Sequence, residues 1–281
     1  MIIDFHSHTF PDKIAAHAIA HMQSLSHTKV YADGTQQGLT DSEVEANIDL
    51  SVVLPVVTNP TKATNINDLS IAHGCKNGLL YFGGIHPDSD NWYDELGRIA
   101  EAGIKGIKLH PLYQGVDIDD IRNVRILNRC AELGLIVVIH AGDDPAFPGQ
   151  VRCSPEMTRK ALKQVEGLTF VAAHMGGLWN WDRVAGELGD MGVYVDTSNA
   201  LGQMEEYGEG FYSHNQLKLM NETQFCTLVR QLGSDRVLYG SDSPWDHQKA
   251  SISRIRASSL TQEEKDNIFY RNACKLLQLS L

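Results

Sequence analysis

The stretch that decides the fold is residues 104–140, IKGIKLHPLYQGVDIDDIRNVRILNRCAELGLIVVIH. It begins with an apolar run at 104–110 and ends with another at 135–140, and neither run alternates strictly between polar and apolar residues. Between them, residues 120–133 repeat apolar side chains at helical spacing. Apolar runs joined by an amphipathic helix are typical of parallel strands covered on both faces. The stretch therefore predicts a strand, a helix and a parallel strand.

The same pattern recurs along the whole chain. Two further helices are predicted at 154–166, which opens with Ser154 and Pro155, and at 261–279, which opens with a capping-box pattern. Strands alternating with helices indicate either a (β/α)8 barrel or a doubly wound sheet. We favour the barrel, because there are eight runs, a closing helix follows the last, and the turn after the first lacks the glycines of a dinucleotide-binding fold. The eight runs are residues 2–6, 52–57, 79–85, 104–110, 135–140, 169–174, 193–197 and 237–242.

Two connections are longer than the rest. Residues 9–50 follow the first strand and are predicted to hold two small helices, and residues 198–215 follow the seventh strand and contain glycines and aromatic residues. In a barrel both would lie over the C-terminal mouth, where the second is a candidate substrate lid. No internal linker is evident, so residues 1–281 are expected to form a single domain.

Charge and composition restrict the partners. The chain has 24 Lys and Arg against 35 Asp and Glu, a formal net charge of −11, which argues against a nucleic-acid partner. No apolar run reaches the roughly 20 residues of a membrane helix, and the N-terminus lacks a signal-peptide pattern. The five cysteines form no Cys-x-x-Cys pair, which indicates reduced thiols in a cytoplasmic protein. The expected partner is a small-molecule substrate, with a homo-oligomer left open.

Histidines gather at the predicted strand ends. Active sites of (β/α)8 barrels form at the C-terminal ends of the strands, so six histidines there point to a site rather than to isolated core residues. The six are His6, His8, His86, His110, His140 and His174.

Four of the strand-end residues predict a metal site. His6 and His8 are two apart on a strand, so both rings point to the same side. Asp242 ends the eighth strand, which neighbours the first in a closed barrel, and His140 is the natural remaining ligand. Imidazole suits zinc, iron, nickel or manganese, and we expect one or two divalent ions per chain, zinc first. Asp242 is also a candidate base.

Other strand-end residues have open roles. His174 either binds a second metal or polarises the substrate. Lys108 either anchors a substrate carboxylate or, carboxylated by CO2, bridges two metals. His110 and Trp245 are candidate substrate contacts.

The strand-end segments that contain these histidines, Lys108 and Asp242 resemble the amidohydrolase superfamily of metal-dependent barrels, in particular the amidohydrolase-related branch. That branch includes aminocarboxymuconate-semialdehyde decarboxylase and γ-resorcylate decarboxylase. Its mononuclear pattern implies His6, His8, His140 and Asp242 as ligands, with His174 as a catalytic group. Residues 106–111, Gly-Ile-Lys-Leu-His-Pro, are also similar to dihydroorotases, which instead implies Lys108 as a bridge and His140 with His174 on a second metal.

The leading expectation is hydrolysis of a small amide, ester or lactone through metal-activated water, with Asp242 taking the proton. The alternative is non-oxidative decarboxylation of a small unsaturated or aromatic acid, with an aromatic pocket wall that includes Trp245. A third reading, of another class, is a non-catalytic barrel that binds a ligand through its metal.

Overall fold

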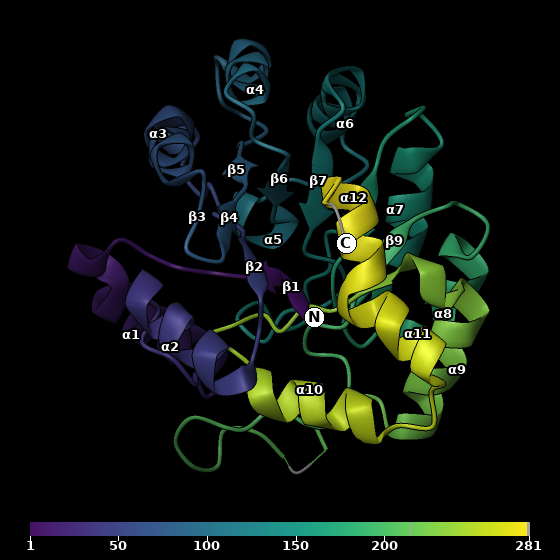
Figure 1. The fold of residues 1–281 in the computed structure, drawn as a ribbon. Helices are drawn as coiled ribbons and strands as arrows, with labels where there is room; N and C mark the ends of the chain where they lie inside the picture. Colours follow the sequence, from purple (N-terminus) through teal and green to yellow (C-terminus); the bar gives the residue numbers. More distant parts are fainter. Residues whose placement is uncertain (214, 280–281) are drawn as a thin grey trace. The chain divides into compact units, whose positions relative to one another are not determined.

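The computed structural model describes residues 1–213 and 215–279, and strands alternate with helices through most of it (Figure 1). The strands are β1 (Ile3–Ser7), β2 (Leu50–Val53), β3 (Cys75–Lys76), β4 (Leu79–Tyr81), β5 (Gly83–Gly84), β6 (Gly106–Leu109), β7 (Ile136–Ile139), β8 (Phe170–Ala172), β9 (Tyr194–Asp196) and β10 (Val237–Leu238). The helices are α1 (Asp12–Ser26), α2 (Gln36–Ala46), α3 (Ala63–His73), α4 (Trp92–Glu101), α5 (Pro111–Gln114), α6 (Ile121–Leu133), α7 (Pro155–Leu162), α8 (Trp181–Leu188), α9 (Glu222–Leu232), α10 (Gln248–Ala257), α11 (Gln262–Asp266) and α12 (Asn272–Leu277).

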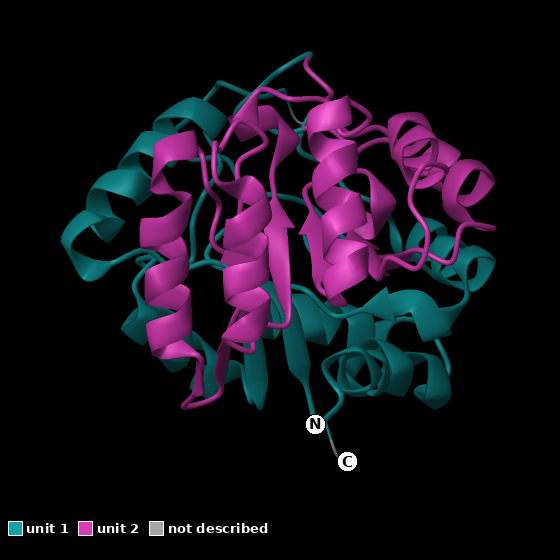
Figure 2. Ribbon diagram, turned by 90° about the horizontal axis from the view of Figure 1, so that it is seen from above, with its two compact units in different colours: residues 1–51, 144–149, 196–281 teal, residues 52–143, 150–195 magenta. Residues whose placement is uncertain are grey.

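The chain divides into two compact units, shown in two colours in Figure 2. Unit 1 comprises residues 1–51, 144–149 and 196–281, and unit 2 comprises residues 52–143 and 150–195.

Unit 2 contains a run of neighbouring parallel strands. β5 pairs with β6, β6 with β7, β7 with β8, and β8 with the residues of β9 that belong to this unit. All residues of β6 and β7 are buried, as the continuous apolar runs predict. Helices of this unit also pack together, α4 against α6 and α7 against α8. The βαβ unit predicted from residues 104–140 is therefore confirmed as β6, α6 and β7.

Unit 1 brings the first and last strands together. The Phe5 amide donates to the Tyr239 carbonyl at 2.7 Å, and the Asp242 amide donates to the His6 carbonyl at 2.8 Å. A parallel bridge between Ser7 and Ser243 extends this pairing to the segment that follows β10. A last strand that lies beside the first is the neighbour relation that a closed barrel requires.

Local signals set the helix boundaries. Asp120 accepts from the Arg122 amide and Ser154 from the Met157 amide, so α6 and α7 begin where the sequence predicts. Thr261 and Glu264 form the predicted capping box. The helix predicted at 261–279 continues as α11, a π-helical stretch at 267–271 and α12.

The third predicted strand is interrupted in the structure. The run 79–85 forms two short strands, β4 and β5, and β4 also pairs antiparallel with β3, which the sequence reading did not include. Gly83 and Gly84 make up all of β5, and a Cβ at Gly84 would lie 2.9 Å from the Pro55 carbonyl oxygen. Close packing of the backbone therefore explains glycine at this position.

The two long connections meet in unit 1. The predicted helices of residues 9–50 are α1 and α2. The segment after β9 docks on the connection between α1 and α2, because the Lys29 amide donates to the Glu205 carbonyl and the Tyr207 amide to the His27 carbonyl. The rings of His27 and Phe211 stack with centroids 3.6 Å apart. Within the loop predicted at 198–215, residue 214 lies outside the described residues.

Two predictions from the sequence concern membrane-spanning helices and the state of the cysteines. No helix in the described residues is long and apolar enough to cross a membrane. All five cysteines are free thiols, four of them buried.

Candidate metal centre

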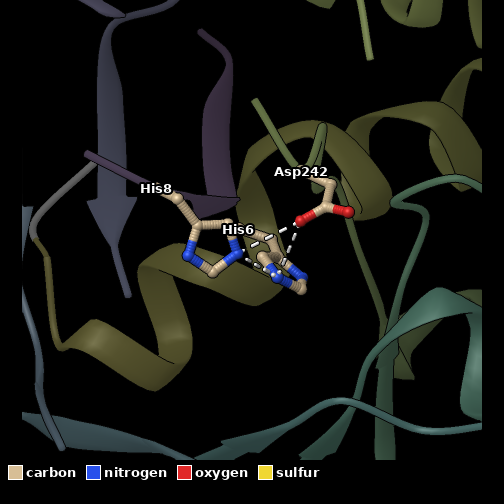
Figure 3. A group of neighbouring side chains, drawn as sticks. All are labelled: His6, His8 and Asp242. Carbon is tan, nitrogen blue, oxygen red and sulfur yellow. Dashed lines mark hydrogen bonds and ion pairs between the residues drawn. The ribbon is translucent and has the colours of Figure 1, made fainter. Parts of the chain in front are cut away.

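Three side chains of unit 1 converge at the ends of β1 and β10 (Figure 3). The Nε2 atoms of His6 and His8 are 3.1 Å apart. Oδ1 of Asp242 lies 3.3 Å from Nε2 of His6 and 3.1 Å from Nε2 of His8. The structure therefore brings together the three unit 1 residues that the sequence predicts as metal ligands.

The pairing of β1 with the end of β10 sets this separation. The His8 amide donates to the Ser243 carbonyl at 2.7 Å, so the main chains on either side of Asp242 are fixed against β1. Gly240 permits the close approach, since a Cβ there would lie 2.9 Å from the Cβ of His6 and 3.2 Å from that of Asp196. A larger residue at 240 would push on the segment that carries His6.

A buried carboxylate orients the His6 ring. Nδ1 of His6 lies 2.8 Å from Oδ2 of Asp196, whose side chain is fully buried. Ser198 donates to the other oxygen of Asp196 and lies 3.2 Å from the same Nδ1. A ring that donates its Nδ1 proton to a carboxylate keeps Nε2 unprotonated, which is the form that binds a metal.

Asp196 and Ser198 were missed by the sequence reading. The available signal was weak: Asp196 lies at the end of the seventh predicted run, as Asp242 lies at the end of the eighth. No motif surrounds it, and its role depends on contact with a residue 190 positions away.

The two oxygens of Asp242 have different surroundings. Oδ1 faces the two histidines, whereas Oδ2 accepts a hydrogen bond of 2.6 Å from the side-chain amide of Asn199. The Asn199 side chain therefore holds the orientation of the Asp242 carboxylate. Asn199 and Asp242 both have left-handed backbones, with φ of 45° and 62°. Such conformations are unfavourable for most residues and are found at functional sites.

The donor set fits a divalent transition metal. Ligands about 2.0–2.1 Å from a tetrahedral ion lie about 3.3 Å from one another, close to the 3.1–3.3 Å measured between these atoms. Two imidazole nitrogens and a carboxylate oxygen are typical ligands of zinc, manganese or iron rather than of calcium. The side chains of all three ligands are largely shielded from solvent.

Trp245 contacts the same group. Its ring packs edge-on against the His8 ring, with centroids 5.7 Å apart, and its amide donates to the Asp242 carbonyl at 2.8 Å. An aromatic wall therefore borders the candidate metal site on the His8 side.

Unit 2 contains a second histidine group. Nε2 of His174 lies 3.0 Å from Nδ1 of His140, and Nε2 of His140 lies 3.0 Å from the Asp143 carbonyl oxygen. The His174 backbone is left-handed, with φ of 57°, and its carbonyl accepts from the Trp181 indole. The nitrogens of His140 and His174 thus face each other at the spacing of two ligands on one ion.

His110 and Lys108 belong to the same unit. The His110 ring stacks on His140 with centroids 4.1 Å apart, and Lys108, two residues earlier on β6, is only 1% exposed. Burial, then the neighbouring His110, His174 and Lys108, hold the pKa of His140 well below its usual range. His140 is therefore neutral at physiological pH.

His86, the last strand-end histidine, has a local role. Its Nδ1 accepts from the Asp88 amide at 3.1 Å, and burial lowers the pKa of its ring. This hydrogen bond fixes the turn that follows β5.

Comparisons with known proteins identify the family and the fold. The family model described as Amidohydrolase matches residues 3–279. No curated protein matches the chain significantly.

Three similar solved structures illustrate the fold. An uncharacterised TIM-barrel protein from Bordetella bronchiseptica has a TM-score of 0.72 at 16% identity, over 99% of this chain and 98% of that one. A manganese-bound 5-carboxyvanillate decarboxylase from Novosphingobium aromaticivorans has a TM-score of 0.68 at 15% identity, over 99% and 96%. A protein assigned as a 2-pyrone-4,6-dicarboxylic acid hydrolase from Pseudomonas putida has a TM-score of 0.64 at 18% identity, over 100% and 98%. The predicted (β/α)8 fold is confirmed, and the chain belongs to the amidohydrolase family of metal-dependent enzymes.

Proposed function

We propose that this enzyme catalyses the metal-dependent, non-oxidative decarboxylation of a small aromatic or unsaturated carboxylic acid. The sequence alone favours hydrolysis, whereas two observations favour decarboxylation, its alternative. Several of the similar structures are decarboxylases of substituted benzoates, although their identity to this chain is 15% or less. The observation that carries the proposal is the aromatic ring of Trp245, which packs against His8 of the His6, His8 and Asp242 group.

In this proposal His6, His8 and Asp242 hold the divalent metal. The metal would supply a positive charge that binds the substrate carboxylate with an adjacent oxygen and stabilises negative charge as CO2 leaves. The bond between the ring carbon and the carboxyl carbon breaks, its electron pair stays on the ring carbon, and a proton takes the place of CO2. We assign the handling of this proton to Asp242 and His174, and the substrate contacts to Trp245 and His110.

The remaining assignments are also proposals. We keep His140 as a further ligand of the same metal. Lys108 and His174 remain candidates for a second metal, which the 3.0 Å approach of His174 to His140 supports. Both assignments are tested by metal analysis after mild purification and by the mass of the peptide that contains Lys108. One ion per chain and an unmodified lysine favour the mononuclear site. The same analysis distinguishes zinc from manganese.

The reaction is tested with a panel of hydroxybenzoates and unsaturated acids in D2O, with zinc- or manganese-loaded enzyme. We expect one CO2 for each substrate consumed and one deuterium at the carbon that lost its carboxyl group. A product that keeps all its carbon refutes decarboxylation.

Hydrolysis of a lactone, ester or amide is the second candidate. The similarity to the protein assigned as a 2-pyrone-4,6-dicarboxylic acid hydrolase favours it, and Asp242 would then act as the base. A lactone panel in H2¹⁸O separates the two reactions, because hydrolysis adds the mass of one water and places ¹⁸O in the product.

A further inference from the structure

A second buried carboxylate, Asp4, lies two residues before His6 and is fully buried. Its Oδ1 accepts from the amides of Ser241 at 2.9 Å and His6 at 3.1 Å. Its Oδ2 accepts from the Gln248 side-chain amide at 2.8 Å and from the Ser241 hydroxyl. Four donors thus surround one carboxylate, and they come from β1, the segment after β10, and α10.

These bonds act on the main chain that carries the metal ligands. Asp4 binds the amide of His6 itself, and Ser241 immediately precedes Asp242. The Ser241 hydroxyl also accepts from the Ser243 amide at 3.0 Å, so both neighbours of Asp242 are tied to one cluster. Asp242 has a left-handed φ of 62°, which Asp adopts more readily than most residues, and these bonds hold the backbone on both sides of it.

We propose that Asp4, with Ser241 and Gln248, is a positioning residue that sets the separation of His6 and Asp242 before the metal binds. The carboxylate joins the backbone of one ligand to the backbone beside the other, so it fixes the distance between them without touching the metal. A site that is already shaped loses less conformational freedom on binding, and therefore binds more tightly. This inference rests on the metal site in the proposed function and is independent of the reaction catalysed there.

Glu43 on α2 provides a matched control. It is also a buried carboxylate of unit 1 and interacts electrostatically with Asp4. Among the described residues, no hydrogen bond joins its side chain to β1 or to the segment after β10. Glu43→Gln should therefore change stability without changing the geometry of His6 and Asp242.

The test measures Co²⁺ affinity and the visible absorption spectrum of the Co²⁺ protein, with the unfolding temperature of the metal-free form. We expect Asp4→Ala and Ser241→Ala to raise the Co²⁺ dissociation constant about 10- to 100-fold and to alter the spectrum. Asp4→Asn, which retains an acceptor for the two amides, should recover part of the affinity. Glu43→Gln should bind Co²⁺ within about twofold of the unmodified chain and keep its spectrum, because the hydrogen bonds that Asp4 accepts from the backbone of His6 and Ser241 remain.

Ser241→Ala removes only a hydroxyl, so it keeps the test decisive where Asp4→Ala does not fold. Unchanged Co²⁺ affinity and spectrum in folded Ser241→Ala and Asp4→Asn would overturn the proposal. Equal weakening by Glu43→Gln would overturn it as well, because the effect would then follow general stability. An unmodified chain that binds no Co²⁺ would refute the metal site itself, which is a different result.

Discussion

Replacing Asp196 by Asn should weaken metal binding while leaving the strands intact. The perturbation keeps the size of the side chain and removes the charge that faces Nδ1 of His6 at 2.8 Å. If the new amide donates to Nδ1, the ring must carry its proton on Nε2, where it can no longer bind a metal. If the amide oxygen faces Nδ1 instead, a neutral hydrogen bond replaces a charge-assisted one.

The magnitude follows from burial. The His6 and Asp196 side chains are 1% and 0% exposed, so solvent does not replace the lost interaction. Hydrogen bonds to charged groups contribute about 1.5–3 kcal/mol. A loss of that size corresponds to a rise of about 10- to 100-fold in the metal dissociation constant, the range found when partners of metal-binding histidines are removed.

The assay is competition between the protein and a chromophoric chelator for Zn²⁺ or Mn²⁺ at pH 7. Asp49→Asn is the control, because Asp49 is an exposed carboxylate that accepts from the Ile2 amide at the other end of β1. We expect that variant to bind metal normally. An Asp196→Asn protein with unchanged affinity would refute the view that this carboxylate selects the His6 tautomer.

Three further predictions concern unit 1. Asn199→Ala should lower kcat by about 10-fold or more in steady-state assays, because Oδ2 of Asp242 loses the donor that holds it; unchanged kcat would contradict this. Gly240→Ala should weaken metal binding in the same competition assay, since the added methyl would lie 2.9 Å from the His6 Cβ, and normal affinity would count against the close approach. Burial raises the pKa of Glu43 to about 7, above its unfolded value of 4.5, so its stabilising contribution is complete below about pH 4.5 and is lost as the pH rises through 7. Glu43→Gln should thus remove about 2 kcal/mol of the pH dependence of unfolding between pH 5 and 8, measured in urea, and an unchanged slope would reject the buried, protonated acid.

The sequence predicted the parts of this molecule that depend on local pattern. Periodicity located β6, α6 and β7, and capping residues such as Ser154 and Thr261 located helix starts. The pairing of the first and last strands then followed from the count of eight runs, and with it the meeting of His6, His8 and Asp242.

Residues that act through a distant partner were not predictable in this way. Asp196 and Asn199 carry no motif, and Asp4 precedes the His6 and His8 pair without a predicted role; each acts only because segments far apart in sequence are adjacent. The interruption of the run 79–85 also depends on a distant residue. Space for a side chain at Gly84 is limited by the Pro55 carbonyl oxygen, a contact that the sequence does not reveal.

Backbone conformation supplies an independent reason to place the chemistry at the strand ends. His174, Met175, Asn199 and Asp242 all follow strands with left-handed φ values of 45–62°. Asn, Asp and His occur in this region more often than other residues with a side chain, whereas Met does not. Local preference would therefore place glycine at residue 175, and the hydrogen bond from the Trp181 indole to the neighbouring His174 carbonyl helps to hold this turn. Strain of this kind at residues that also carry imidazole or carboxylate groups indicates that side-chain chemistry, rather than folding, determines which residues stand there.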